Sequence, residues 1–517
     1  MRIKEIIGLA ILPLLLLTSC DNKLINSSSG NTSTGSTSEA ISNSSVVSSV
    51  NTSTGSTSEA TSNSSVTSNG SSIDKDLPSS ITIYSLNDVH GAIEYEKGSS
   101  KTGMSRMFQA IKKDSDYDEE TSFIISAGDM FQGSALSNLS EGKAMIEIMN
   151  EMNFKAMAVG NHEFDWGVEK LSTLASLANF PFLGINIYSR STNDRVDFVE
   201  DSTIVDVKGA KVGIVGTIYS GAASSISANM IKDIEFKSDV ELAIAEGRRL
   251  KEEEKCDLVI LDTHQGDSTS VDKILESGYF DAGFGGHDHS SGTSKVGSVP
   301  FVKGKANTEA YSKVKFTLSG GNYNSRANYV NSTSSNNSRL ATTPEIEEII
   351  SKYQTEIGPI LEEKLSYAEY DFNKDAVGSL VCYSLYNYGK QYEDVVASYH
   401  NKSGIRSYFS AGDITYKDIY ACSPFDNEVR LVEIDGRDVY GKATGYYSYI
   451  SIPRNEVDNS KTYKVVVFDY IITNGSFGIY EDTEKMINNE VKVVRETVVD
   501  YLKTVDSISP SMFESVN

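Results

Sequence analysis

The chain has 517 residues, enough for two or three domains that each bury a core of their own. Its 47 basic and 71 acidic residues give a formal net charge of −24 at pH 7. This charge argues against sequence-independent binding to polynucleotides, which needs clustered Lys and Arg. It does not exclude a small phosphorylated ligand, because a local metal site can override the charge of the whole chain.

The first residues are typical of an export signal. Arg2 and Lys4 precede an apolar stretch, 6–17, that is too short to span a bilayer as a helix. The stretch runs into Leu17-Thr18-Ser19-Cys20, which resembles the lipobox of bacterial lipoproteins. By that resemblance residues 1–19 are removed and Cys20 carries the lipid, which predicts a protein anchored to the cell membrane and facing the extracellular side. The alternative is an ordinary secretory signal, or a short anchor, with a chance cysteine.

Residues 20–80 are expected to form a disordered tether. From residue 24 they are rich in Ser, Thr, Asn and Gly, and a unit that begins at Asn31 recurs from Asn51 with one substitution. Such a segment buries too little apolar surface to offset the entropy lost on ordering. We expect it to hold a folded body away from the membrane.

Residues 81–318 are expected to form one α/β layered domain, because apolar strand patterns alternate with amphipathic helix patterns. The expected strands are 81–86, 123–127, 156–159, 211–216, 256–261 and 280–284, and the expected helices lie around 104–111, 145–152 and 239–254. A polar cluster follows five of these strands. In layered α/β folds the residues of the site gather at the carboxyl ends of strands.

The polar clusters contain five of the six histidines of the chain. A lone histidine is more often structural than functional, but five at strand ends favour a site. The set comprises Asp88, His90, Asp129, Asn161, His162, Asp165, His264, His287 and His289. Carboxylate and imidazole ligands without thiolate suit Mn²⁺, Zn²⁺, Fe or Co better than Ca²⁺. So many donors suit two ions that share a bridging carboxylate, an arrangement common in hydrolases of phosphate esters.

The rest of the chain is expected to form a connector and a second domain. Residues 319–341 are rich in Asn and Ser and predict a break, and Thr343-Pro344 predicts the start of a helix that Gly358-Pro359 kinks or ends. We therefore assign 319–366 to a linker and connecting helix. Residues 367–517 are expected to form a smaller α+β domain, with a helix around 377–385 and strands at 395–399, 428–434 and 463–468.

The polar clusters, taken in chain order, also carry a family resemblance. They are Asp88-Val89-His90-Gly91, Gly128-Asp129 with Gly133, Gly160-Asn161-His162-Glu163-Phe164-Asp165, the single His264, and Gly285-Gly286-His287-Asp288-His289. These motifs resemble those of the calcineurin-like metallophosphoesterases, and their spelling looks like the 5′-nucleotidase branch. The resemblance covers roughly 81–318 and implies the layered sandwich of that family.

The resemblance implies a role for each residue of the clusters. One divalent ion, such as Mn²⁺ or Zn²⁺, would be held by Asp88, His90 and His289. A second would be held by Asn161, His264 and His287, with Asp129 as the bridge. His162 would be catalytic: it would stabilise the charge on the transferring phosphoryl group and assist the leaving oxygen, oriented by Asp165. A water activated by the metals would attack phosphorus in line.

The second domain resembles the substrate-binding domain of the same branch. The segments are Asn401-Lys402-Ser403-Gly404-Ile405-Arg406 and Pro424-Phe425-Asp426-Asn427. The resemblance implies that Asn401 and Arg406 contact the substrate, and that Phe425 and Tyr470 stack on a base. An Asp that contacts the ribose in the family is missing near Ser476. For His400, beside the first segment, we expect a structural role.

Together these features predict a surface-anchored, two-metal 5′-nucleotidase that removes phosphate from extracellular nucleotides. Hydrolysis of UDP-sugars, or of 2′,3′-cyclic nucleotides with 3′-nucleotidase activity, is the alternative on the same scaffold. A surface adhesin or binding lipoprotein is the non-enzymatic alternative, and it would predict eroded metal ligands. The expected partners are a small phosphate ester and the membrane, and the sequence indicates no polynucleotide and no protein partner.

Overall fold

The computed structural model describes residues 77–97, 99–332, 339–473, 477 and 484–515. The expected export signal, Cys20 and the tether up to residue 76 lie outside the described residues, and so does Ser476. Within the described ranges, no helix combines the length and the apolar composition needed to cross a membrane.

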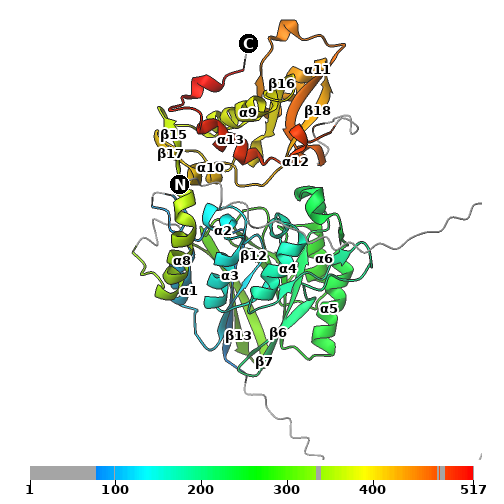
Figure 1. The fold of residues 1–517 in the computed structure, drawn as a ribbon. Coiled ribbons are helices and arrows are strands. Elements are labelled where there is room, and N and C mark those ends of the chain that lie inside the picture. The colour runs from blue at the N-terminus through cyan, green and yellow to red at the C-terminus, as the bar shows by residue number, and fades with distance from the viewer. Residues whose placement is uncertain (1–76, 98, 333–338, 474–476, 478–483, 516–517) are drawn as a thin grey trace, which may run out of the picture. The chain divides into compact units, whose positions relative to one another are not determined.

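Two six-stranded mixed sheets form the centre of residues 77–332 (Figure 1). The first sheet has the order β14 (Asn322–Asn331), β13 (Ala310–Ser319), β1 (Ser80–Leu86), β2 (Ser122–Ser126), β3 (Phe154–Ala158) and β4 (Phe182–Leu183). The second has the order β11 (Gly292–Val296), β12 (Val299–Lys303), β10 (Ala282–Gly285), β9 (Leu258–His264), β7 (Ala210–Ile218) and β6 (Ser202–Val207). Neighbouring strands are parallel from β1 to β4 in the first sheet and from β12 to β7 in the second. The pairs β1–β13, β13–β14, β11–β12 and β6–β7 are antiparallel.

The two sheets pack face to face through a shared apolar core. Ile83 and Ile125 of the first sheet belong to the same buried cluster as Ile214, Ile260 and Phe284 of the second. Because successive side chains of a strand point to opposite faces, their neighbours in sequence face outward. Tyr84 and Ile124, for example, join a different cluster on the outer face of the first sheet.

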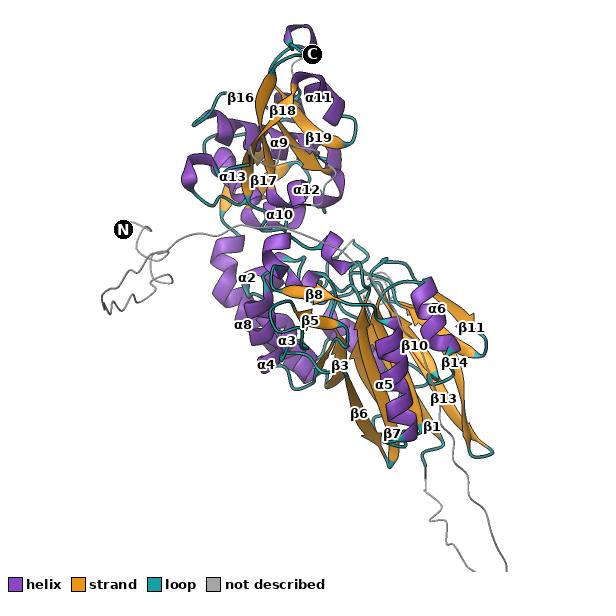
Figure 2. Cartoon of the chain, turned by 90° about the vertical axis from the view of Figure 1, so that its right-hand side faces the viewer, coloured by secondary structure: helices purple, strands orange, loops and turns teal. Residues whose placement is uncertain are grey.

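Helices cover both outer faces (Figure 2). The first sheet is covered by α1 (Met104–Lys112), α2 (Ala135–Leu139), α3 (Lys143–Glu151), α4 (Val168–Leu177) and α8 (Pro344–Leu361), and the second by α5 (Val240–Glu252) and α6 (Thr269–Glu276). Two short antiparallel strands, β5 (Ile187–Ser189) and β8 (Ile234–Phe236), belong to the same apolar cluster as the helices over the first sheet. The layered α/β class expected from the sequence is therefore confirmed.

The expected break at 319–341 is wrong in its first part. Strand β14 pairs with β13 along its whole length, so the expected domain end at 318 falls inside a hairpin. The turn is made by Gly320 and Gly321, at φ 59° and 83°. β14 is an edge strand whose residues alternate between half-buried and exposed, which explains why it is built from Asn, Ser and Tyr without an apolar run.

The remaining residues form an α+β unit with its own core, as expected. Its sheet has the order β18 (Val429–Asp435), β20 (Thr462–Phe468), β16 (Val395–Asn401) and β19 (Tyr446–Ile450), and β15 (Lys364–Ala368) pairs separately with β17 (Gly412–Thr415). The helices are α9 (Lys374–Lys390), α10 (Tyr416–Cys422), α11 (Gly436–Lys442), α12 (Asp469–Thr473) and α13 (Val494–Leu502). The preceding helix α8 runs past Gly358 and Pro359 and ends at Leu361, because a proline in the last turn removes only one hydrogen bond.

The carboxyl ends of β2, β3 and β9 approach one another closely around Gly128. This glycine has φ 87°, and a Cβ atom on it would lie 2.8 Å from the backbone nitrogen of Gly160 and 2.8 Å from Nδ1 of His264. Only a residue without a side chain fits at this point. The close approach brings three of the polar clusters into one space.

This packing makes a testable prediction about two glycines. Gly209, in the hairpin between β6 and β7, has a similar φ of 84° but open space around it. Gly209→Ala should cost about 1–2 kcal/mol of unfolding free energy, the cost of the left-handed backbone alone. Gly128→Ala should cost clearly more, because strain and clash combine. Denaturant unfolding measures both, and equal losses would contradict the close packing at Gly128.

Candidate active site

The residues expected to hold metal come together at one edge of the two sheets. Those from the first sheet follow the carboxyl ends of their strands: Asp88 and His90 follow β1, Asp129 follows β2, and Asn161 follows β3. His162, expected to be catalytic and not a ligand, comes directly after Asn161. Those from the second sheet are His264, the last residue of β9, and His287 and His289 after β10. The sandwich thus places ligands that are up to about 200 residues apart in one cluster.

The ligand atoms fall into two groups. Those of Asp88, His90 and His289 lie within 4.8 Å of one another, and so do those of Asp129, His264 and His287. A third set, His90, Asp129 and His162, also meets this distance and overlaps both groups. Oδ1 of Asn161 joins the second group, 3.0 Å from Nδ1 of His287 and 3.2 Å from Nε2 of His264. Oδ2 of Asp129 lies 3.1 Å from Nε2 of His264 and 4.0 Å from Nε2 of His90, between the groups.

This geometry fits metal ions. Ligands bound to one ion at about 2.0–2.2 Å lie roughly 3 Å from each other. Nε2 of His90 lies 2.9 Å from Nε2 of His289, and the latter lies 3.6 Å from Oδ1 of Asp88. Two imidazole nitrogens that face each other need a cation or a shared proton between them. Imidazole, amide and carboxylate ligands suit first-row transition metals.

Hydrogen bonds to backbone oxygens orient two of the histidines. Nδ1 of His90 donates to the backbone oxygen of Gln132 at 3.1 Å, and Nδ1 of His264 donates to that of Ala127 at 2.7 Å. The proton on Nδ1 leaves Nε2 as the free lone pair, and it faces the cluster in both cases. This arrangement is the usual one for histidines that bind a metal.

The backbone of the site is strained. Five of the clustered residues have the left-handed conformation that side chains disfavour: Asp88 (φ 50°), His90 (49°), Asp129 (57°), His287 (76°) and His289 (56°). Each costs of order 1–3 kcal/mol and persists only where the surroundings enforce it. Strain concentrated on the candidate ligands marks this region as a functional site.

The buried charges of the cluster also favour a cation. Burial lowers the pKa of His264, but Asp129 outweighs this effect and raises it to about 10. Burial likewise opposes the charged form of Asp129, whose pKa the surrounding histidines nevertheless hold well below its usual range. Since a histidine binds a metal only when it is neutral, an ion would displace the proton that Asp129 attracts.

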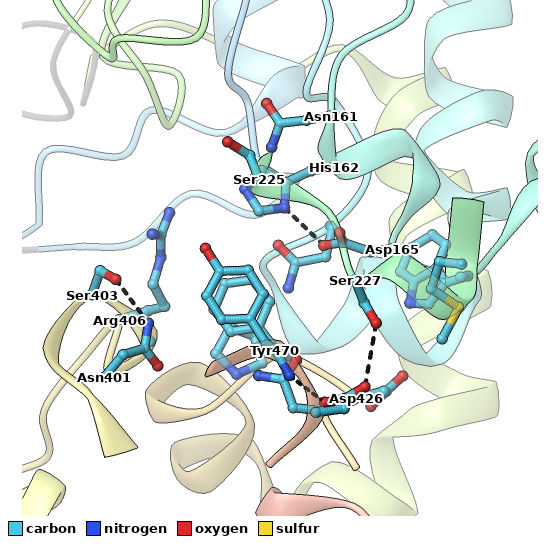
Figure 3. Close-up of a pocket in the computed structure, with 18 of the residues that line it drawn as sticks. Asn161, His162, Asp165, Ser225, Ser227, Asn401, Ser403, Arg406, Asp426 and Tyr470 are labelled. Atoms are coloured by element: carbon cyan, nitrogen blue, oxygen red, sulfur yellow. Dashed lines mark hydrogen bonds and ion pairs between the residues drawn. The ribbon is translucent and has the colours of Figure 1, made fainter. Parts of the chain in front are cut away.

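His162 stands beside the cluster with a carboxylate partner. Its Nδ1 donates to Oδ2 of Asp165 at 2.8 Å (Figure 3). Its backbone N–H donates to Oδ1 of Asp129 at 2.9 Å. Burial lowers the pKa of His162, but Asp165 and Asp129 together raise it to about 9. The imidazole can therefore carry a positive charge beside the metal cluster.

Glu163 is a site residue that the sequence reasoning missed. Its carboxylate is 1% exposed and accepts three backbone N–H groups, from Asp129 (2.8 Å), Met130 (2.7 Å) and Gly160 (2.7 Å). It joins the turns after β2 and β3, so it holds the backbone of both Asp129 and Asn161. The available signal was a carboxylate inside the polar cluster 160–165, between Asn161 and Asp165.

A cavity of about 210 Å³ opens beside the cluster (Figure 3). It is lined by expected residues of both parts of the chain: Asn161, His162, Asp165 and His287 from the first, and Asn401, Arg406, Phe425 and Tyr470 from the second. The ring of Phe425 lies 5.8 Å from that of His162 at 28°, and the guanidinium of Arg406 lies 5.7 Å from the ring of Phe425. In Figure 3 the hydroxyl of Tyr470 points toward Ser225 and His162.

Other lining residues had not been expected. They include Gln132, Trp166, Ser225, Ser227, Met230, Asp426 and Asp469. Gln132 is 2% exposed, and its Nε2 has no hydrogen-bond partner among the described residues. Trp166 and Asp426 directly follow expected residues and could have been proposed on that ground. Ser225 and Ser227 lie in a segment without any pattern.

His400 has the structural setting that was expected. It is 1% exposed, its Nδ1 donates to the backbone oxygen of Asn401 at 2.9 Å, and its ring lies 4.7 Å from that of Phe468. Burial lowers its pKa to about 4, so the ring is neutral at physiological pH. It supports the strand that leads into Asn401.

Comparison with known proteins agrees with this geometry. The calcineurin-like phosphoesterase family matches residues 81–291, and the 5′-nucleotidase C-terminal domain matches residues 354–441. The chain belongs to the 5′-nucleotidase family. It is therefore a metallophosphoesterase, and its His/Asp clusters imply metal ions. This finding speaks against the non-enzymatic alternative of an adhesin.

Individual members of the 5′-nucleotidase family are distant relatives. The 5′-nucleotidase of Vibrio cholerae is 26% identical over an alignment of 428 positions, which covers 71% of this chain and 75% of the relative. Protein UshA of Escherichia coli is 23% identical over an alignment of 524 positions, which covers 85% of this chain and 94% of the relative. The solved structure of a 5′-nucleotidase precursor from Thermus thermophilus covers 83% of this chain and 99% of its own, with a TM-score of 0.68 and 18% identity. At that identity the likeness concerns the fold.

Proposed function

We propose that the protein is a 5′-nucleotidase that uses two divalent metal ions, such as Mn²⁺ or Zn²⁺, to release phosphate from nucleotides. One observation carries this proposal: a single cavity is lined by His162 and the edge of the metal cluster on one side and by Phe425, Tyr470, Asn401 and Arg406 on the other. A molecule with a phosphoryl group at one end and an aromatic base at the other matches this lining.

The metal cluster would hold the phosphoryl group. Asp88, His90 and His289 would bind one ion, and Asn161, His264 and His287 the other, with Asp129 between them. When bound, such ions polarise the phosphoryl oxygens and lower the pKa of a water molecule that attacks phosphorus. The residues of the chain fix where that attack occurs, because Glu163 holds the turns that carry Asp129 and Asn161.

His162 would act on the leaving oxygen. Its charged imidazole, held by Asp165, can stabilise the negative charge that develops on the phosphoryl group and can donate the proton of its free nitrogen to the 5′ oxygen. The raised pKa of His162 favours the protonated form that this step requires. Arg406 lies beside Phe425 and adds a second positive group to the cavity.

Phe425 and Tyr470 would bind the base by stacking. Stacking is worth about 1–3 kcal/mol per base and tolerates any base, because every base has a π face. These residues would therefore select nucleotides as a class. UDP-sugars and 2′,3′-cyclic nucleotides contain the same base and phosphate and remain the alternative substrates on this scaffold.

The fold does not decide between substrates by itself. The solved structure of a sulfate thiohydrolase SoxB from Thermus thermophilus aligns with this chain over 96% of its own length, with a TM-score of 0.63 and 17% identity.

We also propose that the protein is anchored to the cell membrane through lipid on Cys20 and faces the extracellular side. The apolar stretch 6–17 and the position of Cys20 directly after it support that location.

The first test is hydrolysis of AMP. The purified protein supplied with Mn²⁺ or Zn²⁺ should release inorganic phosphate from AMP, and a chelator should abolish the release until metal is restored. UDP-glucose and 2′,3′-cyclic AMP are assayed beside it. If all three stay intact while glycerol phosphate is cleaved, the protein is a phosphoesterase but not a nucleotidase.

The role of His162 is tested by His162→Ala. Loss of a group that donates a proton in the transition state should lower kcat about 10²–10⁴-fold. Both metal sites should still fill, as measured by metal analysis of the dialysed protein. Asp165→Asn keeps a hydrogen-bond partner for the imidazole and should lose less. Loss of metal from the alanine variant would show that His162 is a ligand instead.

The role of Phe425 is tested by Phe425→Ala. Removal of one stacking surface worth about 1–3 kcal/mol should raise KM for AMP by roughly 5–100-fold. Hydrolysis of glycerol phosphate, which has no ring, is the matched control and should change little. An equal loss on both substrates would mean that Phe425 supports His162 and not the base.

A further inference from the structure

A buried lysine lies beneath the turn that carries two of the candidate metal ligands. Lys303 is the last residue of β12 and is 4% exposed. Its ammonium donates to Oδ2 of Asp288, forms an ion pair with Oδ2 of Asp267 at 2.8 Å, and donates to Oγ of Ser290 at 3.0 Å. An ammonium has three N–H donors, and the three partners use them all.

The partners of Lys303 belong to the two loops that bring ligands from the second sheet. Asp288 stands between His287 and His289, and its other oxygen accepts the backbone N–H and the hydroxyl of Ser290 at 3.0 and 2.9 Å. Asp267 comes three residues after His264, and its other oxygen accepts the hydroxyl of Ser294 at 2.7 Å. One ammonium therefore joins the loop after β9 to the turn after β10.

The two loops also pack directly against each other, at Gly266 and Asp288. A Cβ atom on Gly266 would lie 2.4 Å from Oδ2 of Asp288. The turn itself stores strain, because His287 and His289 both have left-handed backbone conformations. Without an attraction that crosses the two loops, this turn could relax and move both imidazoles away from the cluster.

Lys303 also balances charge beneath the site. Oδ2 of Asp267 and Oδ2 of Asp288 converge on the same ammonium. If the ammonium were removed, two carboxylates would face each other. Their repulsion would push apart the loops that Lys303 now holds together.

We propose that Lys303 is a positioning residue for the metal site: through Asp288 and Asp267 it holds His287 and His289 where they can bind. It contacts no ligand atom of the two groups itself, so its effect passes through the turn. The inference rests on the metal requirement of the proposed function, and it adds to the expected ligands a lysine that supports them.

The decisive measurement is metal affinity of the metal-free protein, by calorimetric titration with Mn²⁺ or Zn²⁺. Loss of a group that orients ligands typically weakens metal binding by about 10–100-fold. Lys303→Met should show this loss, and Lys303→Arg, which can still pair with both carboxylates, should recover part of it. Normal affinity in Lys303→Met, or absence of metal binding in the unaltered protein, would overturn the proposal.

A second lysine provides a matched control. Lys313, on β13, is 7% exposed and pairs with Asp114 and, at 2.8 Å, with Asp116 in the turn after α1, which carries none of the candidate ligands. Lys313→Met should lower the thermal unfolding temperature about as much as Lys303→Met but should leave metal affinity unchanged. If Lys313→Met weakens metal binding equally, Lys303 has only a role in stability.

Asp288→Asn keeps the test valid if Lys303→Met does not fold. This variant should lower metal affinity on its own, and combining it with Lys303→Gln should add little, because the two residues act through one contact. Additive losses would contradict the proposal. No step of the titration uses a nucleotide, so a protein that binds metal as described but does not hydrolyse AMP would refute the proposed function and leave the role of Lys303 intact.

Discussion

The site depends on one buried carboxylate. Asp129 is 1% exposed and lies where the carboxyl ends of both sheets meet. One of its oxygens accepts the backbone N–H of His162, and the other lies 3.1 Å from Nε2 of His264. A charge at this depth is costly unless it is paired. The imidazoles around Asp129, and the cations that they and Asp129 can share, provide that pairing.

The fold is arranged so that this pairing is possible. Parallel strands in the middle of each sheet end at the same edge, and the face-to-face packing of the sheets brings the two edges together. The ligands nevertheless sit on turns with strained backbones, so packing alone does not fix them. Glu163 fixes the turns of the first sheet with three backbone hydrogen bonds, and we propose that Lys303 does the same for the second sheet with two ion pairs. On this proposal each sheet has one buried ionisable side chain that holds its candidate ligands.

The second part of the chain lines one side of the cavity beside the metal cluster. Phe425 faces His162, and Arg406 lies over Phe425, so the group that would contact the base is next to the group that would contact the phosphate. An ion pair holds the loop that carries Phe425. Arg495, which is 5% exposed, pairs at 2.5 Å with Asp426, the residue after Phe425. A hydrogen bond from Nδ2 of Asn138 to the backbone oxygen of Pro424 connects this loop to the region that carries the metal cluster.

The sequence by itself determined the layered α/β class, six of the central strands and the five polar clusters, because apolar periodicity and the residues at strand ends are local properties of the chain. It did not show β14, whose Asn, Ser and Tyr residues lack an apolar run because the strand lies at an exposed edge. Only the tertiary structure decided that Glu163 binds three backbone groups, that Lys303 joins two loops, and that Gln132 and Ser227 line the same cavity as Phe425. These contacts connect residues that are distant in sequence or depend on the direction of a single side chain, and no local pattern records either. The sequence alone therefore indicated the candidate ligands and the metallophosphoesterase class, while the packing of the two sheets decided what holds those residues in place.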